Sequence, residues 1–127
     1  MLFDDRLATV LRQSASSQSG HRIQFRQLLD LLGNRTRALG PDEGLREQSL
    51  LAAAWLRMDS LAEIIPAPER ARIIREPGWR FRSPELTVHL AEQEPEVASA
   101  ALARAELSPE QWTELIQHLP IPARGFL

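Results

Sequence analysis

Histidine is the side chain best suited to acid–base or metal chemistry near neutral pH, and this chain has three: His21, His89 and His118. They form neither H-x-x-x-H nor H-E-x-x-H, the spacings that place two imidazoles around a metal on one helix face. His89 precedes Glu92 and Glu94, so a metal or acid–base role would suit it. A partly buried, hydrogen-bonded histidine explains the same pattern. The sequence therefore predicts no catalytic and no metal-binding residue.

Other reactive patterns are missing as well. The chain has no cysteine, which excludes disulfides, zinc–thiolate sites and thiol catalysis. Its glycines are isolated, so no phosphate-binding loop is indicated, and no G-x-S-x-G nucleophile motif occurs. "HLAEQEP" places proline six positions after His89, whereas the phosphoacceptor motif of histidine kinases, H-E-L-R-T-P, has five and a central basic residue. We predict that this chain is not an enzyme and holds no cofactor.

One stretch combines arginines with aromatic residues. "PERARIIREPGWRFRS" carries five arginines against two glutamates, while residues 83–118 carry one arginine against seven glutamates. Arginine beside tryptophan and phenylalanine is typical of protein interfaces and of single-stranded nucleic-acid sites. The same residues could instead fill the gap between helical layers while the arginines pair with acidic helices. The candidate interaction surface comprises Arg70, Arg72, Arg75, Trp79, Arg80, Phe81 and Arg82.

The elements that would position this stretch are helical. Apolar residues at helical spacing predict a helix from Phe3 to about Gln13, and another that ends at Gly33-Asn34. The small polar residues of "SASSQSG" between them predict a loop from 14 to 20. A third helix is expected to begin after Gly40-Pro41-Asp42 and to stop at Pro66. Its segment "LLAAAWLRM" is apolar nearly all round, which is typical of a helix surrounded by others. Its expected core residues are Leu51, Trp55 and Met58.

Four further helices are predicted downstream. Pro68-Glu69 begins a short one, and Ser83-Pro84 and Glu94-Pro95 begin the next two. The last has the strongest signal, because Ser108 and Gln111 have the spacing of a capping box. The remaining expected apolar contacts are Leu86, His89 and Leu90, then Val97, Ala101 and Leu102, then Leu107, Trp112, Leu115 and Ile116.

These elements predict an all-α fold. Roughly seven mostly short helices would stack as antiparallel pairs into a degenerate HEAT-like bundle, a single module over residues 1–127. A net charge of −2 argues against general nucleic-acid binding. The acidic start and the lack of a long apolar run predict neither a secretory signal nor a membrane span, and the lack of cysteine fits a reducing cytoplasm.

Two parts of the sequence resemble a known family. "RIQFRQLLDLLG" and the segment from Ser83 to Leu127, with its phrases L-A-E-x-E-P-x-V-A and L-S-x-x-x-W, are similar to a HEAT-like all-helical N-terminal region of bacterial cytoplasmic sensor histidine kinases that contain a PAS domain. The resemblance covers about half of the chain.

The resemblance implies a non-catalytic sensory or interaction module in the N-terminal part of a longer chain. Its partner would be a protein, including the PAS or kinase domains downstream, and any kinase activity would belong to those domains. A homodimer also remains open. Two alternatives do not need the resemblance: a free-standing helical adaptor that binds a protein, and a small helical nucleic-acid-binding protein.

Overall fold

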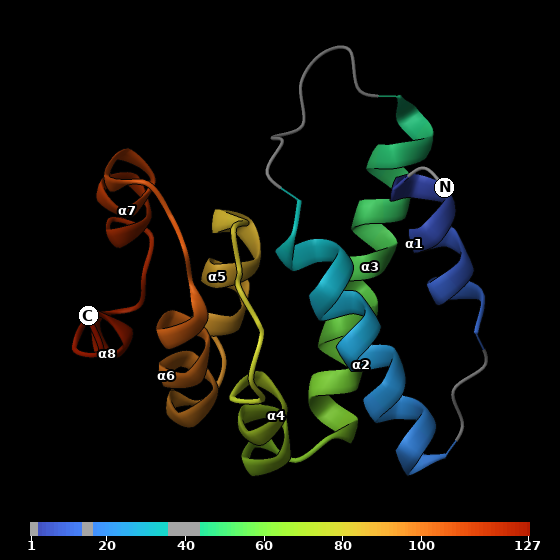
Figure 1. Ribbon diagram of the computed structural model, residues 1–127, viewed down its shortest axis with the longest axis horizontal. Coiled ribbons are helices and arrows are strands. Elements are labelled where there is room, and N and C mark those ends of the chain that lie inside the picture. The colour runs from blue at the N-terminus through green and yellow to red at the C-terminus, as the bar shows by residue number, and fades with distance from the viewer. Residues whose placement is uncertain (1–2, 14–16, 36–43) are drawn as a thin grey trace. The chain divides into compact units, whose positions relative to one another are not determined.

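The computed structural model describes residues 3–13, 17–35 and 44–127 and is helical throughout these ranges apart from turns and connections. The predicted all-α fold is confirmed. Eight helices are present in the described residues, one more than the approximate number predicted, and the additional one is the last (Figure 1). They are α1 (Phe3–Arg12), α2 (Gln18–Gly33), α3 (Leu45–Ile64), α4 (Ala67–Ile74), α5 (Pro84–Ala91), α6 (Pro95–Arg104), α7 (Pro109–Ile116) and α8 (Ile121–Arg124).

The described residues group into two compact units. The first contains α1, most of α2 and α3, and the second contains Leu32–Arg35 at the end of α2 together with Pro66–Leu127. Each unit has its own buried apolar residues. The single module over residues 1–127 stays a prediction.

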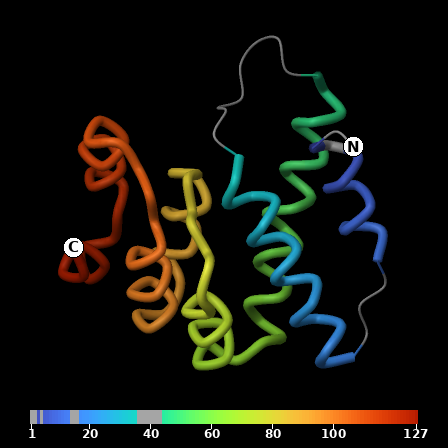
Figure 2. Tube along the Cα trace, in the orientation of Figure 1, coloured from blue at the N-terminus to red at the C-terminus, as the bar shows by residue number. Residues whose placement is uncertain are grey.

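In the first unit, α2 runs antiparallel to α1 and α3, and α1 packs on α3 (Figures 1 and 2). A buried glutamine joins all three helices. Gln24 is 1% exposed; its Nε2 donates to the carbonyl of Val10 (3.1 Å), and its Oε1 accepts from Nε of Arg57 (2.7 Å). Because both polar ends of this amide are paired, its burial does not leave an unsatisfied group. The apolar core of this unit includes Leu7, Val10, Phe25, Leu28, Leu29, Leu51, Ala54, Met58 and Leu61.

The start of α2 corrects one prediction. Gln18–Gly20 were expected in a loop but are helical. The reason is a local cap: Oγ of Ser17 accepts a hydrogen bond from the backbone N–H of Gly20 at 3.0 Å, which satisfies a donor in the first turn. The rest of that predicted loop, residues 14–16, and the predicted start of the third helix at residues 40–42 lie outside the described residues.

The third helix is not surrounded on all sides, so this expectation is wrong. Leu51 and Met58 are buried as predicted, but Trp55 is only half-buried. Leu56 is 68% exposed, because α3 buries only the face that carries Leu51, Ala54, Met58 and Leu61. On the opposite side of the helix, an outward apolar face carries Leu45, Ala52, Ala53, Leu56 and Ile64.

In the second unit, α4 and α5 both pack against α6. The predicted caps are confirmed: Oγ of Ser83 accepts from the N–H of Leu86, and Ser108 and Gln111 form a complete capping box. Ile116 was expected on the buried face of α7 but is 38% exposed, because α7 buries only Leu115. Leu107 and Trp112 pack, partly buried, against a cluster of Ala91, Ala98, Leu102, Leu115, Leu119 and Ala123.

Candidate interaction surface

The arginine–aromatic stretch contains an extended segment, Trp79–Ser83, held by backbone hydrogen bonds on two sides. The N–H of Phe81 donates to the carbonyl of Arg104 (2.9 Å), and the carbonyl of Phe81 accepts from the N–H of Glu106 (2.8 Å). These bonds form an isolated parallel bridge with Ala105. The N–H of Arg82 donates to the carbonyl of Gly33 (2.8 Å). These bonds at Phe81 and Arg82 hold the backbone in the middle of the segment.

Phe81 and Gly33 approach each other closely. Phe81 is fully buried, and a Cβ atom added to Gly33 would lie 2.8 Å from its Cδ1 and 3.4 Å from Cδ2 of Leu86. Glycine is therefore needed at position 33, because any side chain there would collide with the ring of Phe81. The residue that the sequence marked as a helix stop also makes room for the phenylalanine ring.

Side chains along the segment alternate between inside and outside, as in any extended chain. Phe81 points inward, whereas Arg80 and Arg82 are exposed. Trp79 is half-buried: its Nε1 donates to the carbonyl of Ile73 at 2.8 Å, and its ring centroid lies 6.1 Å from that of Phe81. The two aromatic residues thus anchor the segment to the second unit, and the two arginines face solvent.

Arg70 is the opposite case, because it is a buried arginine with three hydrogen-bond contacts to other side chains. It is 1% exposed on α4. Its Nη1 donates to Oε1 of Gln93 (2.6 Å) and to Oε1 of Glu94 (3.1 Å), and its Nη2 donates to Oε2 of Glu94 (2.6 Å). The bonds to Glu94 form a two-pronged pair, the strong geometry for arginine and carboxylate. The hydrogen bond from Arg70 is the main cause that lowers the pKa of Glu94, against a smaller opposing effect of burial.

A second structural arginine, Arg104, was not singled out from the sequence. Its Nε donates to the carbonyl of Ile74 (3.2 Å), and its Nη2 donates to the carbonyl of Arg75. These carbonyls belong to the last residue and the C-cap of α4, where the helix leaves acceptors unsatisfied. In the sequence, an arginine in the last turn of α6 indicates only a favourable interaction with the dipole of its own helix. It does not indicate contact with another helix.

The structure divides the seven predicted surface residues into two groups. Arg70, Phe81 and Trp79 contact other parts of the second unit, as described above. The exposed group is Arg72, Arg75, Arg80 and Arg82. Arg80 has an acidic neighbour, Glu106, but the N···O distance is 3.9 Å and the two side chains are 69% and 56% exposed. Such a pair contributes little to stability.

The other side chains capable of acid–base or metal chemistry do not assemble into a site within the described residues. Across residues 3–13, 17–35 and 44–127, no group of three or more His, Asp or Glu side chains could hold a metal ion. His89 is half-buried and interacts with another group of the protein, while His118 is exposed. Among the helices of the described ranges, none has both the length and the apolar character needed to cross a membrane.

Comparisons of the chain with models of protein families, with curated proteins and with solved structures found no significant match.

Proposed function

We propose that this chain is a non-catalytic sensory or interaction module of a cytoplasmic two-component sensor histidine kinase and that it acts by protein–protein contact. The observation that carries the contact is the pair of outward arginines on the Trp79–Ser83 segment. Arg80 and Arg82 flank Phe81, and backbone hydrogen bonds at Phe81 and Arg82 hold the segment that carries them. Backbone that is ordered before binding loses less conformational entropy when a partner arrives.

The partner that fits these arginines is an acidic protein surface. No ion pair joins Arg82 to another described residue, and the contact of Arg80 with Glu106 is long and solvated. Arginine binds carboxylates through two parallel hydrogen bonds and is enriched at interface hot spots. Arg72 on α4 and Arg75 at its C-cap are exposed and add positive charge in the same unit.

A second surface supports a role in protein contact. The outward face of α3 exposes Leu45 by 81%, Leu56 by 68% and Ile64 by 47%. Large exposed apolar side chains on one helix face are a feature of some interaction sites. This face belongs to the first unit, whereas the arginines belong to the second.

The kinase context rests on the sequence resemblance, and the complete reading frame tests it. A PAS region and a kinase core encoded after Leu127 are expected. A reading frame that ends at Leu127 contradicts the kinase context and leaves the free-standing adaptor. Salt-dependent binding of single-stranded DNA that is lost in an Arg80→Glu, Arg82→Glu variant would instead support the nucleic-acid alternative.

The contact itself is tested with the Arg80→Glu, Arg82→Glu double variant and the segment encoded after Leu127. We expect weaker association, and a larger loss of association rate at low salt than at high salt, because salt screens exposed charges. The free energy of unfolding should change by no more than about 0.5 kcal/mol, since both side chains are exposed.

A matched pair of single variants separates local contact from net charge. Arg82→Glu and Arg12→Glu change the charge equally, and both arginines are exposed, but Arg12 lies at the end of α1 in the first unit. We expect Arg82→Glu to weaken association and Arg12→Glu to leave it near the unmodified value. Equal losses would mean that only overall charge matters, and a destabilised double variant that binds normally would remove this surface from the function.

A further inference from the structure

The outward apolar face of α3 forms a stripe along the whole helix. Its large side chains are well exposed, Leu45 by 81%, Leu56 by 68% and Ile64 by 47%. The positions between them hold small residues that are also exposed, namely Ser49, Ala52, Ala53 and Ser60. The helix has 20 residues, so the stripe is about 30 Å long at about 1.5 Å per residue. A second helix could lie along its whole length.

A second copy of α3 fits this stripe in the antiparallel orientation. In the register centred midway along the helix, each residue lies opposite the one with which its number sums to about 109. Leu45 of one copy then lies near Ile64 of the other, which closes both ends of the contact. Leu56 lies near Ala53, so a large side chain meets a small one, and the helix axes can approach to about 8 Å. Both copies use the same surface, as a twofold dimer requires.

Charged residues near the two ends of α3 select this orientation. Arg46 is the second residue of the helix, Glu63 is the last but one, and both are exposed. In the antiparallel pair, Arg46 of each copy lies opposite Glu63 of the other, whereas in a parallel pair each would meet its own copy and be repelled. Arg46 already contacts Oδ1 of Asp5 at 3.3 Å but stays half-exposed, and its guanidinium has donors enough for a second carboxylate.

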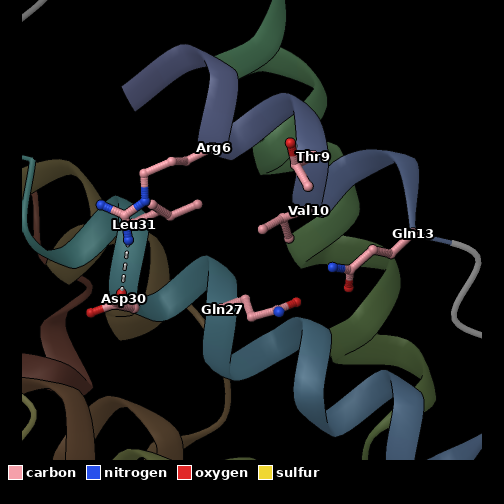
Figure 3. Close-up of a pocket in the computed structure, with 7 residues that line it drawn as sticks. All are labelled: Arg6, Thr9, Val10, Gln13, Gln27, Asp30 and Leu31. Atoms are coloured by element: carbon pink, nitrogen blue, oxygen red, sulfur yellow. Dashed lines mark ion pairs between the residues drawn. The ribbon is translucent and has the colours of Figure 1, made fainter. Parts of the chain in front are cut away.

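The first unit also has a groove between α1 and α2, but this groove does not suit the face of α3. Five of its seven lining residues are polar or charged, and an ion pair between Nη2 of Arg6 and Oδ2 of Asp30 (3.6 Å) lies at one end (Figure 3). An apolar helix face would remove water from these groups without offering them hydrogen bonds. The face of α3 is therefore better matched to a second α3 than to the groove of another copy.

We propose that two copies of this chain form a twofold dimer through antiparallel α3 helices. The proposal names the partner of the α3 face and rests on the part of the proposed function that gives this face a role in protein contact. It does not depend on Arg80 and Arg82, which belong to the second unit. One pair of helices is a small interface, so the dissociation constant should lie between about 1 and about 100 μM.

Sedimentation of the full chain between about 1 μM and about 1 mM tests the assembly. The mass should rise with concentration from 14.3 kDa to twice that value. Leu56→Glu places a charge in the stripe and should raise the dissociation constant at least about tenfold. Ile121→Glu is the matched control and should leave it unchanged, because Ile121 is 78% exposed but lies on α8 in the second unit. A chain that stays monomeric, or equal losses in the two variants, would overturn the dimer.

Charge reversal tests the ion pairs. Arg46→Glu and Glu63→Arg should each raise the dissociation constant about fivefold to tenfold, because each places like charges opposite each other at both ends of the contact. The double variant exchanges the two charges and should restore most of the affinity. Arg12→Glu, exposed at the end of α1, is the control for net charge and should have little effect. A double variant that dimerises more weakly than both single variants would overturn the register.

Single cysteines determine the orientation, because the chain has none of its own. A Ser49→Cys chain and an isotope-labelled Ser60→Cys chain are mixed, mildly oxidised and analysed by mass spectrometry. The mixed disulfide should predominate, because each residue lies about 16 Å along the axis from its own copy, and a disulfide needs Cα atoms within about 7 Å. An excess of the two symmetric disulfides, or a statistical mixture of all three, would overturn the antiparallel pair.

The α3 dimer and the arginine surface can fail separately. The Arg80→Glu, Arg82→Glu variant keeps the α3 face and should dimerise like the unmodified chain. Leu56→Glu keeps both arginines and should associate normally with the segment encoded after Leu127. Loss of the dimer in the arginine variant would overturn the assignment of the dimer to α3.

Discussion

Replacing Glu94 by glutamine should destabilise the protein more than replacing its buried partner, Arg70, by methionine. Glu94→Gln leaves the guanidinium of Arg70, which is 1% exposed, without a countercharge. Breaking a buried ion pair in this way costs about 3–5 kcal/mol when both groups are buried. The Glu94 side chain is 47% exposed, and Gln93 still accepts from Nη1, so the expected loss is smaller, about 2 kcal/mol.

Arg70→Met removes the buried charge together with its desolvation cost. Methionine retains much of the packing volume, and the Glu94 carboxylate, already half-exposed, is free to be solvated by water. The hydrogen bonds that are lost contribute only about 1 kcal/mol each in net terms, and part of that is offset by the removed desolvation. We therefore expect a loss of about 1 kcal/mol.

Glu94 also precedes the first turn of α6, so its charge interacts with the helix dipole as well as with Arg70. Glu96→Gln is the matched control, because Glu96 lies in that first turn and is exposed. It should cost less than about 1 kcal/mol. When Arg70→Met is already present, adding Glu94→Gln should lower the free energy of unfolding by no more than Glu96→Gln does. The difference between its cost in the two backgrounds is the coupling energy of the pair.

The pH dependence provides an independent readout. The pKa of Glu94 is lowered in the folded state, so the pair contributes its full stability above the usual value of 4.5, and this contribution is lost as the pH falls through the lowered pKa. Urea unfolding of the four chains between neutral and acidic pH should show that both single variants lose less stability on acidification than the unmodified chain. Two results would refute this account of the pair. One is that Arg70→Met lowers the free energy of unfolding at neutral pH more than Glu94→Gln does. The other is that both variants keep the acid dependence of the unmodified chain.

Three further changes test the packing by urea denaturation. Gly33→Ala should destabilise by about 1–3 kcal/mol although alanine favours helix, because its Cβ would lie 2.8 Å from Cδ1 of the buried Phe81; a stabilised variant would contradict that contact. Ser108→Ala should cost about 1 kcal/mol through loss of the capping box. Trp112→Ala should cost less than the about 3–5 kcal/mol of a fully buried tryptophan, because the indole is only partly buried; a loss in that range would mean that the indole is more deeply packed in solution.

The helix starts of the second unit could be predicted from sequence because their signals are local. Ser83 and Ser108 bind backbone groups three residues away, so the determinants lie within one turn. Ser17 uses the same interaction with Gly20, but the surrounding small polar residues resembled a loop. The apolar composition of α3 was misleading for a different reason. A helix that is apolar nearly all round indicates burial only if enough neighbours cover it, and their number is a tertiary property.

The division of the arginines depends on contacts that are distant in sequence. The partners of Arg70 are 23 and 24 residues away, and no local pattern connects them. One signal was available: Arg70 precedes Ile73 and Ile74 by three and four residues, which places it on their helix face. Both isoleucines are buried, and so is the arginine. Arg72, between these positions, is exposed.

Composition alone therefore cannot show which part of the arginine–aromatic stretch is available to a partner. Alanine substitutions at Arg70 and Phe81 would reduce binding in a simple assay merely because they lower the folded fraction, since both residues are buried. Substitutions at Arg80 and Arg82 leave the folded fraction nearly unchanged, because both side chains are exposed. A loss of association larger than that caused by Arg12→Glu can thus be assigned to the interface. The residues most sensitive in a scan of this stretch are consequently those that say least about function, and the two exposed arginines on the fixed backbone are the informative ones.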